Sequence, residues 1–426
     1  MEKYKSYKTS GVEWIGHIPI NWNISKYKYN LKILSGFPFK SELFDSEKGF
    51  PLLRIRDITS GSIETYYNGN FDGKYIIKRG DVVIGMDGDF NIREWDNEDI
   101  LLNQRCCKIQ EYNGLLLKFI YYTLPFDLKI INDLTYYTTV KHLSVDDLYN
   151  IKCVIPPISE QTKIVQFLDE KTELVDKLIS TKERKINLLK EQRTSLINHV
   201  VTKGLNPNVK MKDSGVECIG EIPEHWMISK FKFDTSSPVQ YGLNISGDKY
   251  KEEGIRFIRI TDLTEEGELI QEDGKYLEEN EVPSEFFLNK WDVLFCRSGH
   301  TVGKSYLHKE DGKFTSGGYL VRFNFRNYFE SKFVFYIGKT SFYWDWIKLN
   351  SVVSTIENVN GDKYQNFQYP KPSIQEQQSI VEFLDKRTEE IDNLVRLEQN
   401  KINLLKEYRQ SLISEVVTGK IKVTTD

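Results

Sequence analysis

The chain has 426 residues, which is enough for two or three domains that each bury a core of their own. Hydrophobic residues make up 39% of the sequence and aromatic residues 13%, so the composition indicates a folded, globular protein. The five cysteines show no CxxC spacing, which argues against a disulfide framework or a structural zinc site and fits a reducing compartment. The N-terminus is polar and no run of about 18 apolar residues occurs, so we expect a soluble, cytoplasmic protein.

The formal net charge of −4 is unevenly distributed along the chain. Between Thr264 and Glu285 there are nine acidic residues and one basic residue, a local balance of −8 that leaves the remaining residues at +4. Overall charge therefore neither supports nor excludes a nucleic-acid partner, because a basic face can coexist with an acidic surface elsewhere. The acidic run itself is most simply a solvated loop.

Several segments of the sequence occur twice. SGVEWIGHIP returns as SGVECIGEIP with eight of ten residues identical, and KINLLKEQRTSLINHVVT returns as KINLLKEYRQSLISEVVT with fourteen of eighteen identical. The matching pairs are residues 10–19 with 214–223, 159–179 with 375–395, and 185–202 with 401–418. The spacing is 204 residues at the first pair and 216 at the later pairs, so the second copy has gained 12 residues. The chain is a tandem duplication.

Residues 1–155 are expected to form a first domain of mixed α/β structure. DVVIGM at 81–86 is short, rich in β-branched residues and bounded by Gly and Asp, which is typical of a strand. Asp87 and Asp89 follow it on either side of a glycine. Two acids around a glycine indicate a turn more than a metal site.

Residues 156–203 are expected to form a long helix that ends before Gly204. Its apolar residues recur mostly at spacings of three, four or seven, namely Ile164, Leu168, Val175, Leu178, Ile186, Leu189, Leu196 and Val200. A helix of about 40 residues spans roughly 60 Å, so it must project from a domain of this size. We expect it to pair as an antiparallel coiled coil with its second copy, Lys182 and Arg193 helping to set the register. The alternative, that each helix packs back on its own domain, stays open.

After a linker at 204–213, residues 214–370 are expected to form a second domain and 371–426 the second helix and tail. DVLFC and YLVRFNF are strand-like segments of this second insert. The predicted fold class is thus α+β, with two mixed domains separated by two long helices. Antiparallel helices would relate the halves by an approximate two-fold axis, which suits a partner with local dyads such as duplex DNA.

The two inserts have diverged and share only scattered matches. One is LLRIRDI against FIRITDL, which pairs Arg54 with Arg259 and Asp57 with Asp262. Because these residues recur in otherwise different inserts, the two arginines are expected to serve the shared framework or to bind phosphate rather than to read bases.

The stretch FCRSGHTVGKSYL at 295–307 ends like a nucleotide-binding loop. A P-loop requires Gly, four residues, then Gly-Lys-Ser or Gly-Lys-Thr and a long helix, whereas Ser298 stands where the first Gly belongs. The turn Asp311-Gly312 leaves no room for that helix. GDVVIGMDGDF occupies the matching place in the first insert without any Lys-Ser. We therefore expect a recognition loop here, and the rival reading as a P-loop ATPase is disfavoured.

The sequence shows no recognisable catalytic motif. No Asn-Pro-Pro-Tyr type tetrad for amino-methyl transfer occurs, and the nearest string, Asn206-Pro207-Asn208, lies in the linker. No Glu-x-Lys nuclease signature lies in a suitable strand, and the six histidines have no metal-ligand spacing. The sequence therefore offers no candidate residues for methyl transfer, nuclease chemistry or a metal site.

The whole chain resembles the specificity subunits of type I restriction-modification systems. The resemblance rests on the SGVE segments followed by Trp22 and Trp226, on EQTKIVQFLD and EQQSIVEFLD, and on the insert phrases GMDGDF with LLNQR, TVKHLSVDDL and RSGHTVGKS. It implies two target recognition domains, each reading one half of a bipartite double-stranded DNA sequence, and two helices that space them. It also implies no cofactor on this chain. Two methyltransferase subunits would bind S-adenosylmethionine and methylate adenine, and nuclease-translocase subunits would use ATP and Mg²⁺.

DNA recognition needs phosphate contacts for affinity and base-edge contacts for specificity. Side chains that can supply both are the candidate contacts: Arg54, Arg56, Asn91, Arg93, Gln104, Arg105, Lys141 and His142 in the first insert, and Arg256, Arg259, Arg297, His300, Thr301, Lys304 and Arg322 in the second. Because the inserts differ, the half-sites should differ and the target should be asymmetric. A coiled-coil scaffold whose end domains bind proteins is the alternative function.

Overall fold

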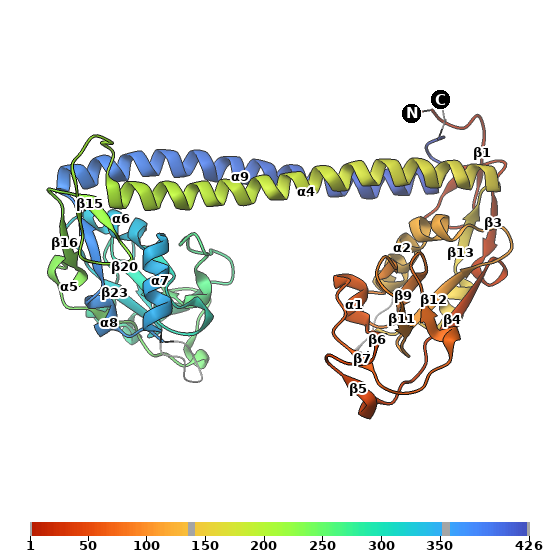
Figure 1. The fold of residues 1–426 in the computed structure, drawn as a ribbon, viewed down its shortest axis with the longest axis horizontal. Helices are drawn as coiled ribbons and strands as arrows, with labels where there is room; N and C mark the ends of the chain where they lie inside the picture. The colour runs from red at the N-terminus through yellow and green to blue at the C-terminus, as the bar shows by residue number, and fades with distance from the viewer. Residues whose placement is uncertain (1, 135–140, 352–357, 424–426) are drawn as a thin grey trace. The chain divides into compact units, whose positions relative to one another are not determined.

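The computed structural model describes residues 2–134, 141–351 and 358–423 (Figure 1). It divides into two compact units: unit 1 is Met1–Lys182 with Asn400–Asp426, and unit 2 is Glu183–Gln399. Each unit contains one insert and one stretch of each long helix. Thr139 and Val140, the first two residues of the phrase TVKHLSVDDL, lie outside the described residues.

The core of unit 1 is a four-stranded antiparallel sheet in the order β10-β9-β12-β4. Its strands are β4 (Leu31–Ser35), β9 (Val82–Gly85), β10 (Ile92–Glu94) and β12 (Cys106–Glu111). A second sheet of this unit has five strands in the order β5-β7-β6-β11-β8. Its strands are β5 (Phe44–Asp45), β6 (Phe50–Leu53), β7 (Tyr66–Tyr67), β8 (Ile76–Ile77) and β11 (Ile100–Leu102). Two ribbons pair β1 (Tyr7–Thr9) with β2 (His17–Pro19), and β3 (Asn23–Lys26) with β13 (Lys152–Ile155). The segment expected to be a strand at 81–86 is β9, all four of whose residues are buried.

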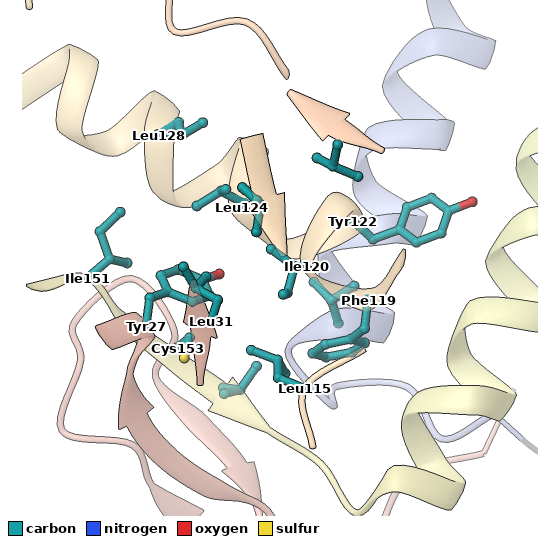
Figure 2. Packing of buried hydrophobic residues seen from close by; sticks show 14 of the residues in the cluster. Tyr27, Leu31, Leu115, Phe119, Ile120, Tyr122, Leu124, Leu128, Ile151 and Cys153 are labelled. Carbon is teal, nitrogen blue, oxygen red and sulfur yellow. The ribbon is translucent and has the colours of Figure 1, made fainter. Parts of the chain in front are cut away.

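The helices of this insert are α1 (Ile55–Ser60), α2 (Leu117–Leu134) and α3 (Val145–Asn150). α2 packs against β10 and β12 and supplies much of the apolar core. Figure 2 shows this core, with Phe119, Ile120 and Leu124 of α2 close to Tyr27 and Leu31. These aromatic and aliphatic side chains are almost completely buried, which is the main favourable contribution to folding of a domain this size.

The four-stranded sheet of unit 2 has the same strand order as that of unit 1 although the insert has diverged in sequence, whereas its second sheet has three strands instead of five. Its four-stranded sheet has the order β21-β20-β23-β17, from β17 (Gln240–Tyr241), β20 (Val293–Cys296), β21 (Ser305–Leu307) and β23 (Leu320–Phe323). The second sheet contains β18 (Ile255–Ile258), β19 (Lys275–Leu277) and β22 (Phe314–Ser316). Two ribbons pair β14 (Met211–Asp213) with β15 (Glu221–Pro223), and β16 (Met227–Lys230) with β24 (Gln368–Lys371). The helices are α5 (Phe231–Asp234), α6 (Tyr328–Ile337), α7 (Ser341–Asn350) and α8 (Gly361–Gln365). The duplication therefore includes the inserts as well as the segments that still match.

The long helices are α4 (Ile158–Lys203) and α9 (Ile374–Val417). In unit 1 Arg409 Nε of α9 pairs with Asp176 Oδ1 of α4 at 3.1 Å, and in unit 2 Arg193 Nε of α4 pairs with Asp392 Oδ1 of α9 at 2.9 Å. The early part of each helix thus meets the late part of the other, and the predicted antiparallel pairing is confirmed. Each helix also packs on its insert, so the two packing modes coexist.

The predicted apolar stripe was wrong at one position. Leu178 is 51% exposed, whereas its neighbour Ile179 is buried. With 3.6 residues per turn, the step of four from Val175 to Ile179 and of seven to Ile186 keeps the buried side chains on one face.

The tryptophans that follow the repeated SGVE segments hold the ends of the two helices together. In unit 1 the buried Trp22 donates from Nε1 to Oε2 of Glu160 in the first turn of α4 at 2.6 Å, and Gly419 after α9 lies against its ring. In unit 2 Trp226 donates to Glu376 of α9 at 3.0 Å, and Gly204 after α4 lies against its ring. Both glycines have positive φ (+74°), the conformation that ends a helix.

Candidate nucleic-acid interface

Three loops meet at one end of the four-stranded sheet in unit 1, and we call them the first loop cluster. They are residues 86–91 after β9, 103–105 before β12, and 141–144 before α3. Backbone hydrogen bonds join them: Met86 N donates to Arg105 O at 2.9 Å, and Leu143 N donates to Met86 O at 2.7 Å. The loops therefore form one continuous surface of fixed backbone.

Unit 2 repeats this arrangement in a second loop cluster, residues 297–301, 317–319 and 358–360. Arg297 N donates to Tyr319 O and Val359 N donates to Arg297 O, both at 2.9 Å. The β-bridge between Asp87 and His142 in unit 1 has its counterpart between Ser298 and Asn358. The backbone framework is the same in both clusters, while the side chains on it differ.

In the first loop cluster the charged side chains gather around Asp87. His142 Nδ1 lies 2.6 Å from Asp87 Oδ1, and Arg105 Nε lies 3.5 Å from Oδ2. Arg105 and His142 remain 58% and 53% exposed, and Gln104 beside them is exposed. Lys141 Nζ donates to the Asn132 carbonyl at 2.6 Å. The predicted residues Gln104, Arg105, Lys141 and His142 thus come together.

Asp87 was interpreted from the sequence only as a turn residue. The turn is present, with Gly88 at φ +78°, but the carboxylate also orients the two exposed donors. Within the described ranges, no group of three His, Cys, Asp or Glu side chains is placed to hold a metal ion.

In the second loop cluster Arg297 is the central cation. Its guanidinium lies 4.8 Å from the ring centroid of Tyr241, and its Nη1 is 3.5 Å from the Gly318 carbonyl. Its buried Nε has no acceptor among the described residues. His300 is exposed, and so is Tyr319, at 59%. An arginine stacked on an aromatic ring with unused donors is preorganised for planar hydrogen-bonding groups.

Two further predicted residues of this stretch have partners inside unit 2. Thr301 is 2% exposed and donates to the Ser298 carbonyl at 3.2 Å. Lys304, 12% exposed, pairs with Glu265 Oε1 of the acidic run at 2.7 Å. A short 3-10 helix, Gly299–Thr301, is followed by strand β21. The expected lack of a helix after GKS is confirmed, and this loop does not have the strand-to-helix geometry of a P-loop.

The repeated Arg-x-x-Asp residues begin a helical turn in both units. Arg54 N donates to Asp57 Oδ2 at 2.7 Å, and Arg259 N donates to Asp262 Oδ2 at 3.1 Å. The Arg259 guanidinium also pairs with Asp262, at 2.7 Å, and the Arg54 guanidinium lies 5.7 Å from the ring centroid of Phe44. These contacts favour the framework role considered for the two arginines.

Arg56, Asn91 and Arg93 lie away from the first loop cluster's charged centre. Arg56, 63% exposed, pairs with Glu64 at 3.1 Å. Arg93 pairs with Asp96 at 2.9 Å, and with Asn91 it lines a polar cavity of about 750 Å³.

Arg256 and Arg322 are built into the interior of unit 2. Arg256 is 5% exposed and donates to the carbonyls of Phe257, Lys275 and Ile270 and to Asp262. Arg322 Nε pairs with the fully buried Asp292 at 2.6 Å. Lys108 and Asp81 form the same pair at the same strand positions in unit 1. Each of these cations balances a carboxylate or carbonyls of its own unit, so neither Arg256 nor Arg322 is available as a surface contact.

Comparison with known proteins places these units in one family. A model described as the type I restriction modification DNA specificity domain matches twice, at residues 19–191 and 240–407. The type I restriction enzyme EcoBI specificity subunit of Escherichia coli is 30% identical over 405 residues, covering 91% of this chain and 84% of that protein. The MjaVIII specificity subunit of Methanocaldococcus jannaschii is 22% identical over 95% of this chain and 94% of that one. A chain from a solved structure of complex assembly in the type I R-M system has a TM-score of 0.70 at 17% identity and covers 95% of this chain and 99% of its own.

Proposed function

Because the chain belongs to the family of type I restriction-modification DNA specificity subunits, we propose that its two loop clusters read the two halves of a bipartite DNA target. The specificity subunit is the non-catalytic member of the complex, and the cofactor-using activities reside in the methyltransferase and nuclease subunits with which it assembles. None of the helices in the described parts of the chain is long and apolar enough to cross a membrane. We place the protein in the cytoplasm, where DNA and these partners occur.

The observation that carries the proposal is one backbone framework with two sets of side chains. Loops joined by equivalent hydrogen bonds present an Asp87-centred group in unit 1 and Arg297 with His300 in unit 2. Different donors and acceptors suit different base edges, since each base pair shows a distinct pattern in the major groove. The target should therefore be asymmetric, with one half-site for each unit.

We assign base reading to four exposed side chains, Gln104, Arg105 and His142 in unit 1 and His300 in unit 2, and to the partly exposed Arg297. Lys141, Lys304, Arg54, Arg56, Arg93, Asn91 and Arg259 are assigned to phosphate contacts or support, because most are held by neighbouring carboxylates or carbonyls. Arg256, Thr301 and Arg322 are left out of the interface because their side chains are satisfied inside unit 2.

The test replaces one base-reading arginine in each unit, by Arg105→Ala and Arg297→Ala, in the complex with the methyltransferase subunits. Loss of a bidentate base contact should weaken cognate binding by about 5- to 150-fold, which corresponds to about 1–3 kcal/mol. Each variant should relax methylation specificity in one half-site only. Lys304→Ala should weaken binding to all sequences alike. The control is Arg387→Ala, an exposed arginine of α9 that pairs with Glu390.

Methylation mapping and gel-shift titration at moderate salt give the readouts. Normal cognate binding by both Arg105→Ala and Arg297→Ala would contradict the loop assignment. Palindromic methylated sites would contradict an asymmetric target. If the assembled complex conferred no sequence-specific modification at all, the alternative of a scaffold with protein-binding end domains would be favoured.

A further inference from the structure

A cavity of about 580 Å³ lies in unit 1, away from the loop cluster. Its walls come from the first SGVE segment, α2, β13 and the last turns of α9, and they include Trp14, Phe126, Ile130, Val154 and Val417. This volume is typical of a site for a small group, and the walls are mostly apolar with a few polar side chains. Neither DNA reading nor the pairing of the long helices uses it.

A buried carboxylate faces this cavity. Asp127 of α2 is 7% exposed and accepts hydrogen bonds from Tyr27 Oη at 3.1 Å and from Trp14 Nε1 at 3.3 Å. Both donors are neutral, and no lysine or arginine pairs with Asp127 in the part of the chain that the structure describes. Burial raises the pKa of Asp127 to about 7, because the charged form loses solvation that these two donors replace only in part. A cation entering the cavity would supply the missing counter-charge.

The same cavity exists in unit 2 without the carboxylate. Tyr122 of unit 1 and Tyr336 of unit 2 make the same contacts, with Asp169 and Asp385 respectively, which aligns α2 with α6 and α7. In this alignment Asp127 corresponds to Ser341. A smaller cavity of about 290 Å³ is lined by Ser341, Ser195, Asn198 and Thr202, together with Cys218 at the position of Trp14. His199 and Lys203 also line it, and no Asp or Glu of the described residues does. Residues 195, 198 and 202 match 411, 414 and 418 of the first cavity.

The position of the cavities identifies the occupant. Both are lined in part by the segments that the two copies still share, the SGVE segment and the late part of a long helix, and a partner that binds twice requires the same framework twice. The proposed complex contains two methyltransferase subunits, and we take this subunit as the partner. Glu407 and Glu415 line the first cavity besides Asp127, and Lys129 and Lys420 are the cations on its walls, so the acids outnumber the cations by one. Its apolar walls suit the aliphatic stem of a basic side chain.

We infer that the first cavity receives an arginine or lysine side chain of a docked methyltransferase subunit, and that the second methyltransferase subunit docks at unit 2 without this ion pair, because the second cavity has no carboxylate among its described residues and is lined by His199 and Lys203. The two methyltransferase subunits then bind with unequal affinity, the tighter one at unit 1. This inference rests on the proposed function, since it requires the same partner in the same complex.

The test titrates the methyltransferase subunit into the full-length chain and follows both binding steps by calorimetry and native mass spectrometry. The wild-type chain should show two sites whose Kd values differ by at least 10-fold. Asp127→Asn should weaken the tight site by at least 10-fold and leave the weak one unchanged. Ser341→Asp should tighten the weak site. Asp99→Asn, which removes an exposed carboxylate of unit 1, is the matched control and should change neither site.

Asn keeps the shape of the side chain and still accepts from Tyr27 and Trp14, so a purely structural Asp127 would leave both Kd values unchanged. Equal wild-type affinities, or two Kd values within 2-fold of wild type in Asp127→Asn, would overturn the inference. Cognate DNA binding by the saturated complexes reports separately on the proposed function. It should be normal in Asp127→Asn, whereas its absence in the wild-type complex would overturn the proposed function instead.

Discussion

Replacing Arg322 with Ala tests whether this arginine stabilises the fold of unit 2 rather than contacting DNA. The substitution leaves Asp292 fully buried without its cation, and its remaining donors are Asn324 Nδ2 at 2.6 Å and Asn289 N at 2.8 Å. Removing one partner of a buried ion pair costs about 3–5 kcal/mol. For a unit of this size that is a fall in Tm of roughly 6–20 °C. Calorimetric unfolding of the full-length chain measures it.

The loss should depend on pH in a direction that the structure fixes. Burial raises the pKa of Asp292 above its usual value of 3.8, and Arg322 opposes that rise. Without Arg322 the pKa rises further, so the unfolding free energy is reduced most above that pKa, where Asp292 is charged. The deficit should shrink as the pH falls and the carboxyl group takes up a proton.

Two matched variants complete this experiment. Lys108→Ala removes the corresponding cation in unit 1, and it should cost less because Asp81 is 21% exposed and can be solvated. Arg297→Ala should leave Tm almost unchanged while weakening cognate DNA binding. The reasoning is refuted if Arg322→Ala unfolds at the wild-type temperature, or if it weakens DNA binding as Arg297→Ala does while the protein is fully folded.

Four further substitutions test the framework. Burial raises the pKa of Asp127 from 3.8 to about 7, so between these two values the folded wild type keeps a proton that the unfolded chain releases. The unfolding free energy of the wild type therefore falls as the pH rises, and the advantage of Asp127→Asn over the wild type should grow by about 3 kcal/mol from pH 5 to pH 8. A difference in unfolding free energy that stays constant with pH in urea titrations would disprove this. Gly36→Ala would place a Cβ 1.9 Å from Asn103 O, and Gly242→Ala would place a Cβ 2.2 Å from Ser316 O. Each variant should displace the turn beside its loop cluster and reduce specificity in one half-site. Methylation mapping would show this loss. Glu376→Gln weakens the charged acceptor of Trp226 and should lower the unfolding free energy by about 1 kcal/mol, whereas an unchanged urea midpoint would mean that this hydrogen bond contributes little.

The sequence predicts the framework of this protein better than it predicts the site. The duplication and the long helices follow from repetition and from the 3.6-residue period, which act over tens of residues. The shared topology of the two inserts was not visible, because strands of two to six residues are set by pairing across the sheet and leave little periodic signal.

Residue type alone did not distinguish buried arginines from exposed ones. Arg256 and Arg322 were candidates for DNA contact because arginine commonly makes such contacts, and only the structure shows the carboxylates that hold them. A signal was available for Arg322: the strands DVVIG and DVLFC both begin with Asp, and each is paired with a strand that carries a single inward cation. For Asp87, no local signal existed, because its partner His142 lies 55 residues away.

The two clusters show how one fold can present different chemistry in its two copies. Backbone hydrogen bonds join the loops, and the buried pairs Asp81–Lys108 and Asp292–Arg322 hold the central strands, so neither depends on the exposed side chains at the loop tips. Substitutions of exposed, loosely packed side chains change stability little. A loop residue such as His300 can therefore change with almost no cost in folding, whereas Trp22 cannot, because it contacts the start of α4 and the end of α9 at once. Repetition of the tryptophan and divergence of the loops are two consequences of the same distribution of stabilising contacts.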